Sequence, residues 1–463
     1  MKNATLKKAT VWSLVSLASL MGACADLDEP IEGQSMEKER WDARNAPERF
    51  TDITLKYDFD SLPTSGRAEA DVWPSTYWAT YEDSINVQWK AGELSPAQKY
   101  DVAFNGWVVP EGFMDLKPYT NGEGCKEYDK AYYEQLGPLA SYISTNMGNG
   151  DARDGVDSDD DGEIDECDDR DGVEKWFGLC HAWVPAAMRE DRPLHSIEYN
   201  GVTFHTGDLE ALIIAAYNRS GAEMIGGRCN DKEVERDETG RAIATGCRDT
   251  NPGTLHVIMT NYLGLNQTSF AEDKTYDYEV WNQPVVAYEV TKQEEISIEE
   301  ANELLQVGQN EAGEESGADE ADSDTDAPAS VEYTFNPDAK YFYSVAANIT
   351  YITESKASVE PADSAEFERK SYYTYILELD ENRQIIGGEW TNSSRRNHPD
   401  FLWNPRRAWR SAVPNLDLDK VRELIQLARK EPVPTPAIET ADDPVDSSDG
   451  PMDAPGEAID SID

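Results

Sequence analysis

The chain has 463 residues and a formal net charge of −50, with 41 Lys and Arg against 91 Asp and Glu. Such a charge repels nucleic-acid phosphates and anionic lipid, so we expect no nucleic-acid binding and no electrostatic adhesion to membranes. Hydrophobic residues make up 39 % and aromatic residues 10 % of the chain, which is enough for a packed core and excludes a wholly disordered protein.

The first residues predict an export signal with a lipid anchor. Three lysines precede an apolar run at residues 9–21, which is too short to span a membrane and ends in small residues before Cys24. Met-Gly-Ala-Cys resembles a bacterial lipobox, which implies a signal peptide at 1–23 and lipidation of Cys24. We therefore expect an exported protein on a bacterial outer membrane or cell surface, held only by its lipid anchor, with a polar tether at 24–48.

Much of the negative charge lies in three segments. Residues 151–173 hold twelve acidic and two basic residues, residues 310–327 hold eight acids, and residues 431–463 hold ten. The last two contain too little apolar surface to offset the entropy lost on ordering, so we expect a disordered insert and a disordered tail. The rest of the chain then carries about −22.

The first acidic segment has the spacing of a calcium-binding loop. Asp157, Asp159 and Asp161 occupy alternate positions, and Gly162 follows them. Asp165 and Asp168 occupy the ninth and twelfth positions of the loop. The segment resembles EF-hand loops and thrombospondin type 3 calcium repeats. Either resemblance implies a structural or regulatory Ca²⁺ held by Asp157, Asp159, Asp161, Glu163, Asp165 and Asp168.

We expect calorimetry on the intact protein to detect Ca²⁺ binding, because so many neighbouring carboxylates repel one another without a cation. The loop ends shortly before Cys180, so bound Ca²⁺ would order the approach to that residue. Absence of Ca²⁺ binding would favour the alternative, a solvated acidic loop.

Six cysteines in an exported chain predict disulfides, since such compartments are oxidising. If the N-terminal cysteine is lipidated, five remain and one is unpaired. Cys229 and Cys247 flank a polar loop and form a natural local pair. Cys125 could then pair with Cys167, which leaves Cys180 free.

Cys180 lies in the segment EKWFGLCHAWVPAAMRE. Pro185 fits best in the first turn of a helix, which places Cys180 at or just before the helix N-terminus. The helix dipole and the free N–H groups there would favour a thiolate and could hold an oxyanion. A buried structural cysteine is the alternative.

A cysteine nucleophile needs a base, and the chain has only five histidines. His256 lies in the apolar, β-branched run 255–260, which predicts a central strand whose head could face Cys180. Asp273 and Asp277 follow after the length of a turn and an antiparallel strand, where a carboxylate could orient the imidazole. A satisfied core histidine is the alternative for His256.

The segment Val-Trp-Asn-Gln-Pro-Val at 280–285 resembles the defining motif of the transglutaminase elicitor family, secreted enzymes of plant pathogens. Phe-Gly-Leu-Cys-His-Ala-Trp at 177–183 and His-Pro-Asp-Phe-Leu-Trp at 398–403 agree with it. The similarity runs in order from about residue 95 to 405, most of the mature chain.

The resemblance implies an α+β fold related to papain-like enzymes and transglutaminase cores, in which a helix carries Cys and antiparallel strands carry His and Asp. It implies a protein-glutamine γ-glutamyltransferase that crosslinks Gln to Lys, or deamidates Gln, through a thioester and without an organic cofactor. Its partners would be proteins with accessible Gln and Lys. The implied catalytic residues are Cys180, His256 and Asp273, with Asp277 as the alternate acid. The implied substrate-binding residues are Trp183, Trp281 and Asn282.

We expect the catalytic domain at 49–411 and a short C-terminal helix at 412–430. Beyond residue 285 the chain departs from the elicitor peptide, so activity as a plant elicitor is not expected. Two rival functions stay open: a papain-like cysteine peptidase or amidase, and a non-catalytic calcium-binding surface lipoprotein. Three measurements separate the transferase from these two rivals: ammonia release, the appearance of new protein N-termini, and labelling of the thiol.

Overall fold

The computed structural model describes residues 43–119, 128–150, 175–229, 250–275, 278–311, 335–395, 397–406 and 411–430. Several of the predicted features lie outside these residues: the signal peptide with Cys24, the calcium loop, Cys125, Cys167, Cys247, Asp277 and the acidic tail. Among the described helices, none has both the length and the hydropathy that a membrane crossing needs.

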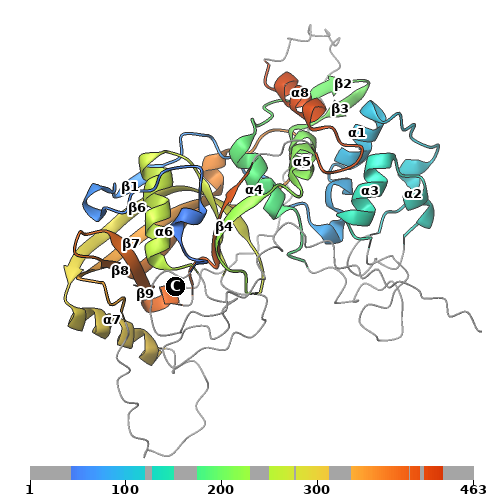
Figure 1. Ribbon diagram of the computed structural model, residues 1–463. Helices are drawn as coiled ribbons and strands as arrows, with labels where there is room; N and C mark the ends of the chain where they lie inside the picture. The colour runs from blue at the N-terminus through green and yellow to red at the C-terminus, as the bar shows by residue number, and fades with distance from the viewer. Residues whose placement is uncertain are drawn as a thin grey trace, which may run out of the picture. The chain divides into compact units, whose positions relative to one another are not determined.

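An antiparallel sheet of eight strands dominates the described part of the chain (Figure 1). In spatial order its strands are β4 (Ala222–Gly226), β10 (Phe401–Pro405), β5 (Phe270–Asp273), β6 (Asn282–Ile296), β7 (Tyr341–Ile352), β8 (Glu368–Leu379) and β9 (Ile385–Trp390), and β1 (Ser65–Arg67) pairs with β6. A separate hairpin pairs β2 (Ile197–Tyr199) with β3 (Val202–Phe204). The register that matters for the site pairs Asp273 of β5 with Asn282 of β6.

The α-helices are α1 (Pro96–Phe104), α2 (Lys130–Glu134), α3 (Pro138–Asn146), α4 (Cys180–Arg189), α5 (Thr206–Tyr217), α6 (Pro252–Met259), α7 (Ile298–Glu311) and α8 (Leu418–Ala428). Figure 1 shows α4 and α5 between the strands and helices α1 to α3. Helix α8 lies within residues 412–430, where a short helix was expected, and it packs its apolar side against α5. Helix α7 extends two residues into the insert that was predicted to be disordered.

Alternation of side chains along the strands divides the sheet into two faces. Phe270 and Val285 point to the core that contains helix α6, and we call this side the α6 face. Ala271 and Val286 point to the core that contains helix α4, and we call that side the α4 face. Any residue of β5 or β6 can therefore be assigned to one face by its position.

Residues 255–260 are helical, so the predicted central strand is wrong. Asn251 caps α6 through a hydrogen bond of 2.9 Å from the Gly253 N–H to its side-chain oxygen, and Pro252 occupies the first turn. Every residue of α6 is buried. A short helix enclosed on all sides has the same apolar composition as a central strand, and periodicity does not separate the two.

Helix α4 begins at Cys180, as the sequence predicted. Pro185 lies in the second turn of this helix and not in the first. The carbonyl of His181 consequently loses the N–H that would normally bond to it. Packing of the surrounding side chains, including the fully buried Trp183 and Val184, holds the helix together at this point.

Candidate active site

Cys180 is a buried thiol that faces the start of β6. It is the free cysteine among the described residues, which confirms the prediction that it is unpaired. The side-chain amide of Asn282 donates to its Sγ at 3.4 Å, and Sγ lies 3.8 Å from the carbonyl oxygen of Val280. Cys229 forms a disulfide whose partner lies outside the described residues, so its pairing with Cys247 stays a prediction.

Two backbone N–H groups at the start of α4 have no hydrogen-bond acceptor among the described residues; we call them the open N–H groups. The preceding Leu179 N–H bonds to the carbonyl of Tyr77 at 2.5 Å, whereas those of Cys180 and His181 donate to no described residue. Gly178 makes this approach possible, because a Cβ there would lie 2.4 Å from the ring of Tyr77 and 2.6 Å from its carbonyl oxygen. The open groups point from a helix N-terminus, where an oxyanion is stabilised.

Asp273 lies beside Asn282 on the α4 face. Its Oδ1 accepts hydrogen bonds from the N–H of Trp281 at 2.9 Å and from the N–H and hydroxyl of Thr275 at 3.3 and 3.1 Å. Its Oδ2 is buried and has no partner among the described residues. Burial raises the pKa of Asp273 to about 7, against the effect of these hydrogen bonds.

A second carboxylate, Glu354, follows the end of β7. Its charge contributes to the raised pKa of Cys180. The side-chain amide of Gln283 donates to Glu354 Oε1 at 2.9 Å and fixes its orientation. Burial raises the pKa of Glu354. Sequence reasoning missed this residue, because only the fold brings it to this part of the molecule.

The thiol is protonated at neutral pH. Burial raises the pKa of Cys180 to about 11; hydrogen bonds from Asn282 oppose the rise, and the charges of Glu354 and Asp273 add to it. Burial thus opposes the thiolate that the helix N-terminus was expected to favour, because loss of solvation penalises the charged form. Attack by this sulfur needs a base.

The structure does not bring His256 to Cys180. The imidazole Nδ1 lies 2.8 Å from the hydroxyl of Tyr375, a strand β8 residue that points to the α6 face. Cys180 lies on the α4 face, so the thickness of the sheet separates the two side chains. Burial lowers the pKa of His256 to about 3. His256 is thus a satisfied core residue on a helix, and the predicted triad is corrected at this position.

No other histidine hydrogen-bonds to the thiol within the described residues. His181 contacts the side chain of Asn218 at 2.9 Å, and burial lowers its pKa. His205 forms the turn before α5 and contacts Ser196. His398 stacks on Trp390, at a ring distance of 4.9 Å. None of these histidines is therefore placed to exchange a proton with the thiol.

The substrate-binding residues implied by the sequence fall into two groups. Trp183 is wholly buried, and its ring N–H bonds to the carbonyl of Trp73 at 3.1 Å, so its assignment to substrate binding is wrong. Trp281 is partly exposed and packs edge-on against Tyr77 at 5.8 Å. Asn282 touches the thiol. Trp281 and Asn282 stay candidates for substrate contact.

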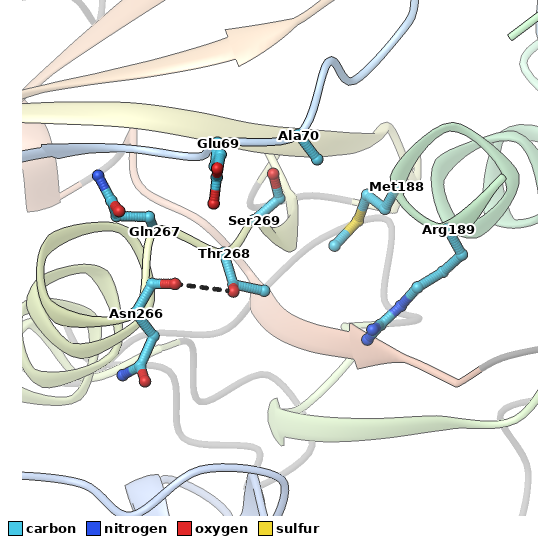
Figure 2. A pocket seen from close by; sticks show the side chains of 8 residues that line it. All are labelled: Glu69, Ala70, Met188, Arg189, Asn266, Gln267, Thr268 and Ser269. Carbon is cyan, nitrogen blue, oxygen red and sulfur yellow. Dashed lines mark hydrogen bonds between the residues drawn. The ribbon is translucent and has the colours of Figure 1, made fainter. Parts of the chain in front are cut away.

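A cavity of about 340 Å³ lies away from the thiol, at the other end of α4 (Figure 2). Its lining residues are Glu69, Ala70, Met188, Arg189, Asn266, Gln267, Thr268 and Ser269. Met188 and Arg189 end the helix that Cys180 begins, about 13 Å along its axis. The cavity is therefore separate from the thiol site. Within the described ranges, no group of acidic, His or Cys side chains is arranged to hold a metal ion.

Glu272, next to Asp273, points to the α6 face and is fully buried. Neither of its carboxyl oxygens has a partner among the described residues. Burial raises the pKa of Glu272 to about 8, so the folded chain holds this proton where the unfolded chain releases it. The buried carboxyl therefore lowers the free energy of unfolding. This loss is absent below pH 4.5, the ordinary pKa of the carboxyl, and it grows until the pH passes about 8.

We accordingly expect Glu272→Gln to stabilise the protein against heat at about pH 8.5 by up to a few kcal/mol, and to change stability little at about pH 5. Thermal unfolding at both pH values measures the effect. Glu289→Gln, an exposed residue of β6, is the matched control and should shift neither midpoint. Equal midpoints for wild type and Glu272→Gln at the higher pH would contradict the burial argument.

The fold and the site together define an α+β protein with a curled antiparallel sheet and a buried thiol at a helix start, facing Asn and Asp on neighbouring strands. The chain belongs to the transglutaminase elicitor family, whose model matches residues 45–310 and 318–430.

The crystal structure of the GP42 transglutaminase from Phytophthora sojae is similar to this chain, with a TM-score of 0.59 and 28 % sequence identity. The similarity covers 83 % of this chain and 97 % of the other. No curated protein matches the chain.

Proposed function

We propose that the chain is a protein-glutamine γ-glutamyltransferase with Cys180 as its nucleophile. The observation that carries the proposal is one free thiol at a helix N-terminus, next to two open backbone N–H groups and a carboxylate with a free oxygen. Membership of the transglutaminase elicitor family and the likeness to a crystal structure of a transglutaminase support it.

In the first half-reaction, Sγ of Cys180 bonds to the carboxamide carbon of a protein Gln, and the thiol proton passes to Asp273. The backbone N–H groups of Cys180 and His181 hold the resulting oxyanion. The C–N bond then breaks, Asp273 returns the proton to the nitrogen, and ammonia leaves. A thioester on Cys180 remains.

In the second half-reaction, a Lys amine or a water molecule attacks the thioester. A proton of the attacking group reaches the sulfur by way of Asp273, and the C–S bond breaks. The amine gives an isopeptide crosslink, and water gives deamidation to Glu. Proteins with accessible Gln and Lys are the proposed partners.

Asp273 takes the place that the sequence resemblance gave to histidine. A general base works best when its pKa lies near the working pH, and burial raises the pKa of this carboxyl to about 7. Its Oδ2 is not engaged by any described residue, whereas Oδ1 is held by the backbone. One oxygen is thus fixed and the other is left for proton exchange.

Further parts of the proposal rest on sequence alone. We propose a papain-like or transglutaminase-like core, because a cysteine helix followed by a strand with an acidic residue is common to such enzymes. Export, the lipidated Cys24 and a Ca²⁺-binding loop remain proposals in the same sense. No step of the chemistry above passes through the metal.

The test is an assay of the full mature protein on a Gln-rich protein such as casein, with dansyl-cadaverine as the amine. Ammonia release with dansyl incorporation supports the proposal. New N-termini on casein would instead identify a cysteine peptidase. Absence of both, with no labelling of Cys180 by a Gln-mimicking electrophile, would identify a non-catalytic lipoprotein.

A further inference from the structure

The buried amine of Lys99 lies between two carboxyl groups, far from the chemistry proposed for the thiol. Its Nζ is 2.6 Å from Oδ2 of Asp208, the third residue of α5, and 2.7 Å from Oε2 of Glu93. Lys99 belongs to α1, and α1 packs against α5. The amine and the carboxyl of Asp208 thus meet although they are 109 positions apart in the chain.

The contact between Lys99 and Asp208 is closed off from water. Lys99 is 3 % exposed and Asp208 is fully buried. A buried ion pair has lost the hydration of both charges, and the attraction between them repays this loss only in part. Burial raises the pKa of Asp208 against the effect of Lys99, which brings the carboxyl closer to its neutral form. An amide bond between the two side chains would remove both charges from the interior.

The carboxyl of Asp208 is oriented for attack by the amine. The ring N–H of Trp89 donates to Oδ1 at 2.9 Å, where negative charge would develop if a nitrogen bonded to the carbon. The backbone N–H of His205 donates to Oδ2 at 2.8 Å. Because Nζ of Lys99 touches Oδ2, it is at most one carbon–oxygen bond further from the carboxyl carbon. Such an approach needs no rearrangement of the backbone.

Glu93 is placed to move protons away from the amine. Burial opposes its charge, but hydrogen bonds from two lysines and a histidine outweigh this effect and lower the pKa of Glu93 to about 2. Glu93 is therefore a carboxylate that can accept a proton from Lys99. Its side chain is 28 % exposed, so it connects the buried contact with the protein surface.

We propose that Lys99 and Asp208 form an intramolecular isopeptide bond, with Glu93 as the proton carrier. Once Glu93 has taken one proton from the ammonium, the nitrogen lone pair of Lys99 forms a bond to Cγ of Asp208. The bond from Cγ to Oδ2 then breaks. Two protons leave the nitrogen in all, and both end on the departing oxygen, which leaves as water. One ammonium and one carboxylate become one amide and one water, and nothing is oxidised or reduced.

This bond is independent of the proposed transferase function. A crosslink between Gln and Lys releases ammonia and requires Cys180, whereas the bond between Lys99 and Asp208 releases water and requires no nucleophilic cysteine. It would fasten α1 to α5 covalently, so that unfolding could not separate the two helices.

Mass spectrometry of the reduced, full mature chain tests the bond directly. We expect an intact mass lower than the calculated mass by one water molecule, and one branched tryptic peptide that contains both Lys99 and Asp208. Glu93→Gln, which loses the proton carrier, and Lys99→Arg, which loses the nucleophile, should show no loss of water. Cleavage by trypsin after Lys99 in the wild type, with no water lost, would overturn the inference. The wild-type measurement decides even if a variant does not fold.

Two controls make the result specific. Glu111→Gln removes an exposed carboxyl and should keep both the loss of water and the branched peptide. Cys180→Ala should keep them as well, so failure of the isopeptide bond and failure of the transferase activity are separate results. A branched peptide joined at Glu93 instead of Asp208, or a loss of water that disappears in Cys180→Ala, would contradict the assignment.

Discussion

Cys180→Ala is expected to abolish ammonia release from a Gln donor and incorporation of amines, because no other free thiol is found among the described residues. Cys180→Ser, which keeps nearly the same volume, should lower the rate by about 10³-fold or more, since a hydroxyl is a far weaker nucleophile. Ammonia release measured by a coupled assay gives both rates.

Both variants should stay folded, because replacing one small buried side chain by another costs only about 1 kcal/mol. The thermal midpoint therefore serves as the control and should fall by no more than a few degrees. Retained ammonia release in Cys180→Ala would end the interpretation of this residue as the nucleophile.

Asp273→Asn is expected to slow ammonia release by about 10² to 10⁴-fold, because the variant loses the proton acceptor for a thiol that is protonated at neutral pH. Asparagine has the same shape and still accepts from the N–H of Trp281, so positioning is preserved. Wild-type activity should rise with pH through about 7, as the carboxyl of Asp273 ionises. The variant should lose this rise and gain activity only at much higher pH.

His256→Gln is the matched control for this prediction. Gln keeps a hydrogen bond to the hydroxyl of Tyr375, and the sheet separates this position from the thiol. Its activity per folded molecule should stay within about twofold of wild type, with the folded fraction taken from thermal unfolding. The triad implied by the sequence resemblance predicts instead that His256→Gln loses more activity than Asp273→Asn. A severe loss of activity in His256→Gln would therefore contradict the assignment of Asp273 as the base.

The local features of the site were predictable because they depend on neighbours in the chain. The helix start at Cys180 was predicted from the nearby proline, and the unpaired state of Cys180 from an odd cysteine count. The spacing after His256 indicated an antiparallel strand near Asp273, where β5 ends. The helix that carries His256 also left a signal in the sequence, since Asn251 and Pro252 form a cap and a first-turn proline. The apolar run that follows them outweighed this signal and produced the wrong prediction of a strand.

The remaining features depend on which residues the fold brings together. Glu354 follows β7, which pairs with β6. The length of the segment between these two strands does not reveal that they pair. The raised pKa of Cys180 reflects the depth at which α4 is buried, and sequence reveals the helix start but not this depth. The sequence around Trp183 does not distinguish a core tryptophan from one that faces a substrate. Only the packing of Trp183 in the core separates the two roles.

Adjacent acids on β5 present one carboxyl to each side of the sheet, Glu272 to the α6 face and Asp273 to the α4 face. Both have pKa values raised by burial, to about 8 and about 7. In the proposed chemistry, ionisation of Asp273 prepares the thiol for attack, yet ionisation of either group weakens the fold. A rise in pH that increases activity through Asp273 should therefore also lower the thermal stability that these two groups allow, so activity and heat resistance should have different pH optima.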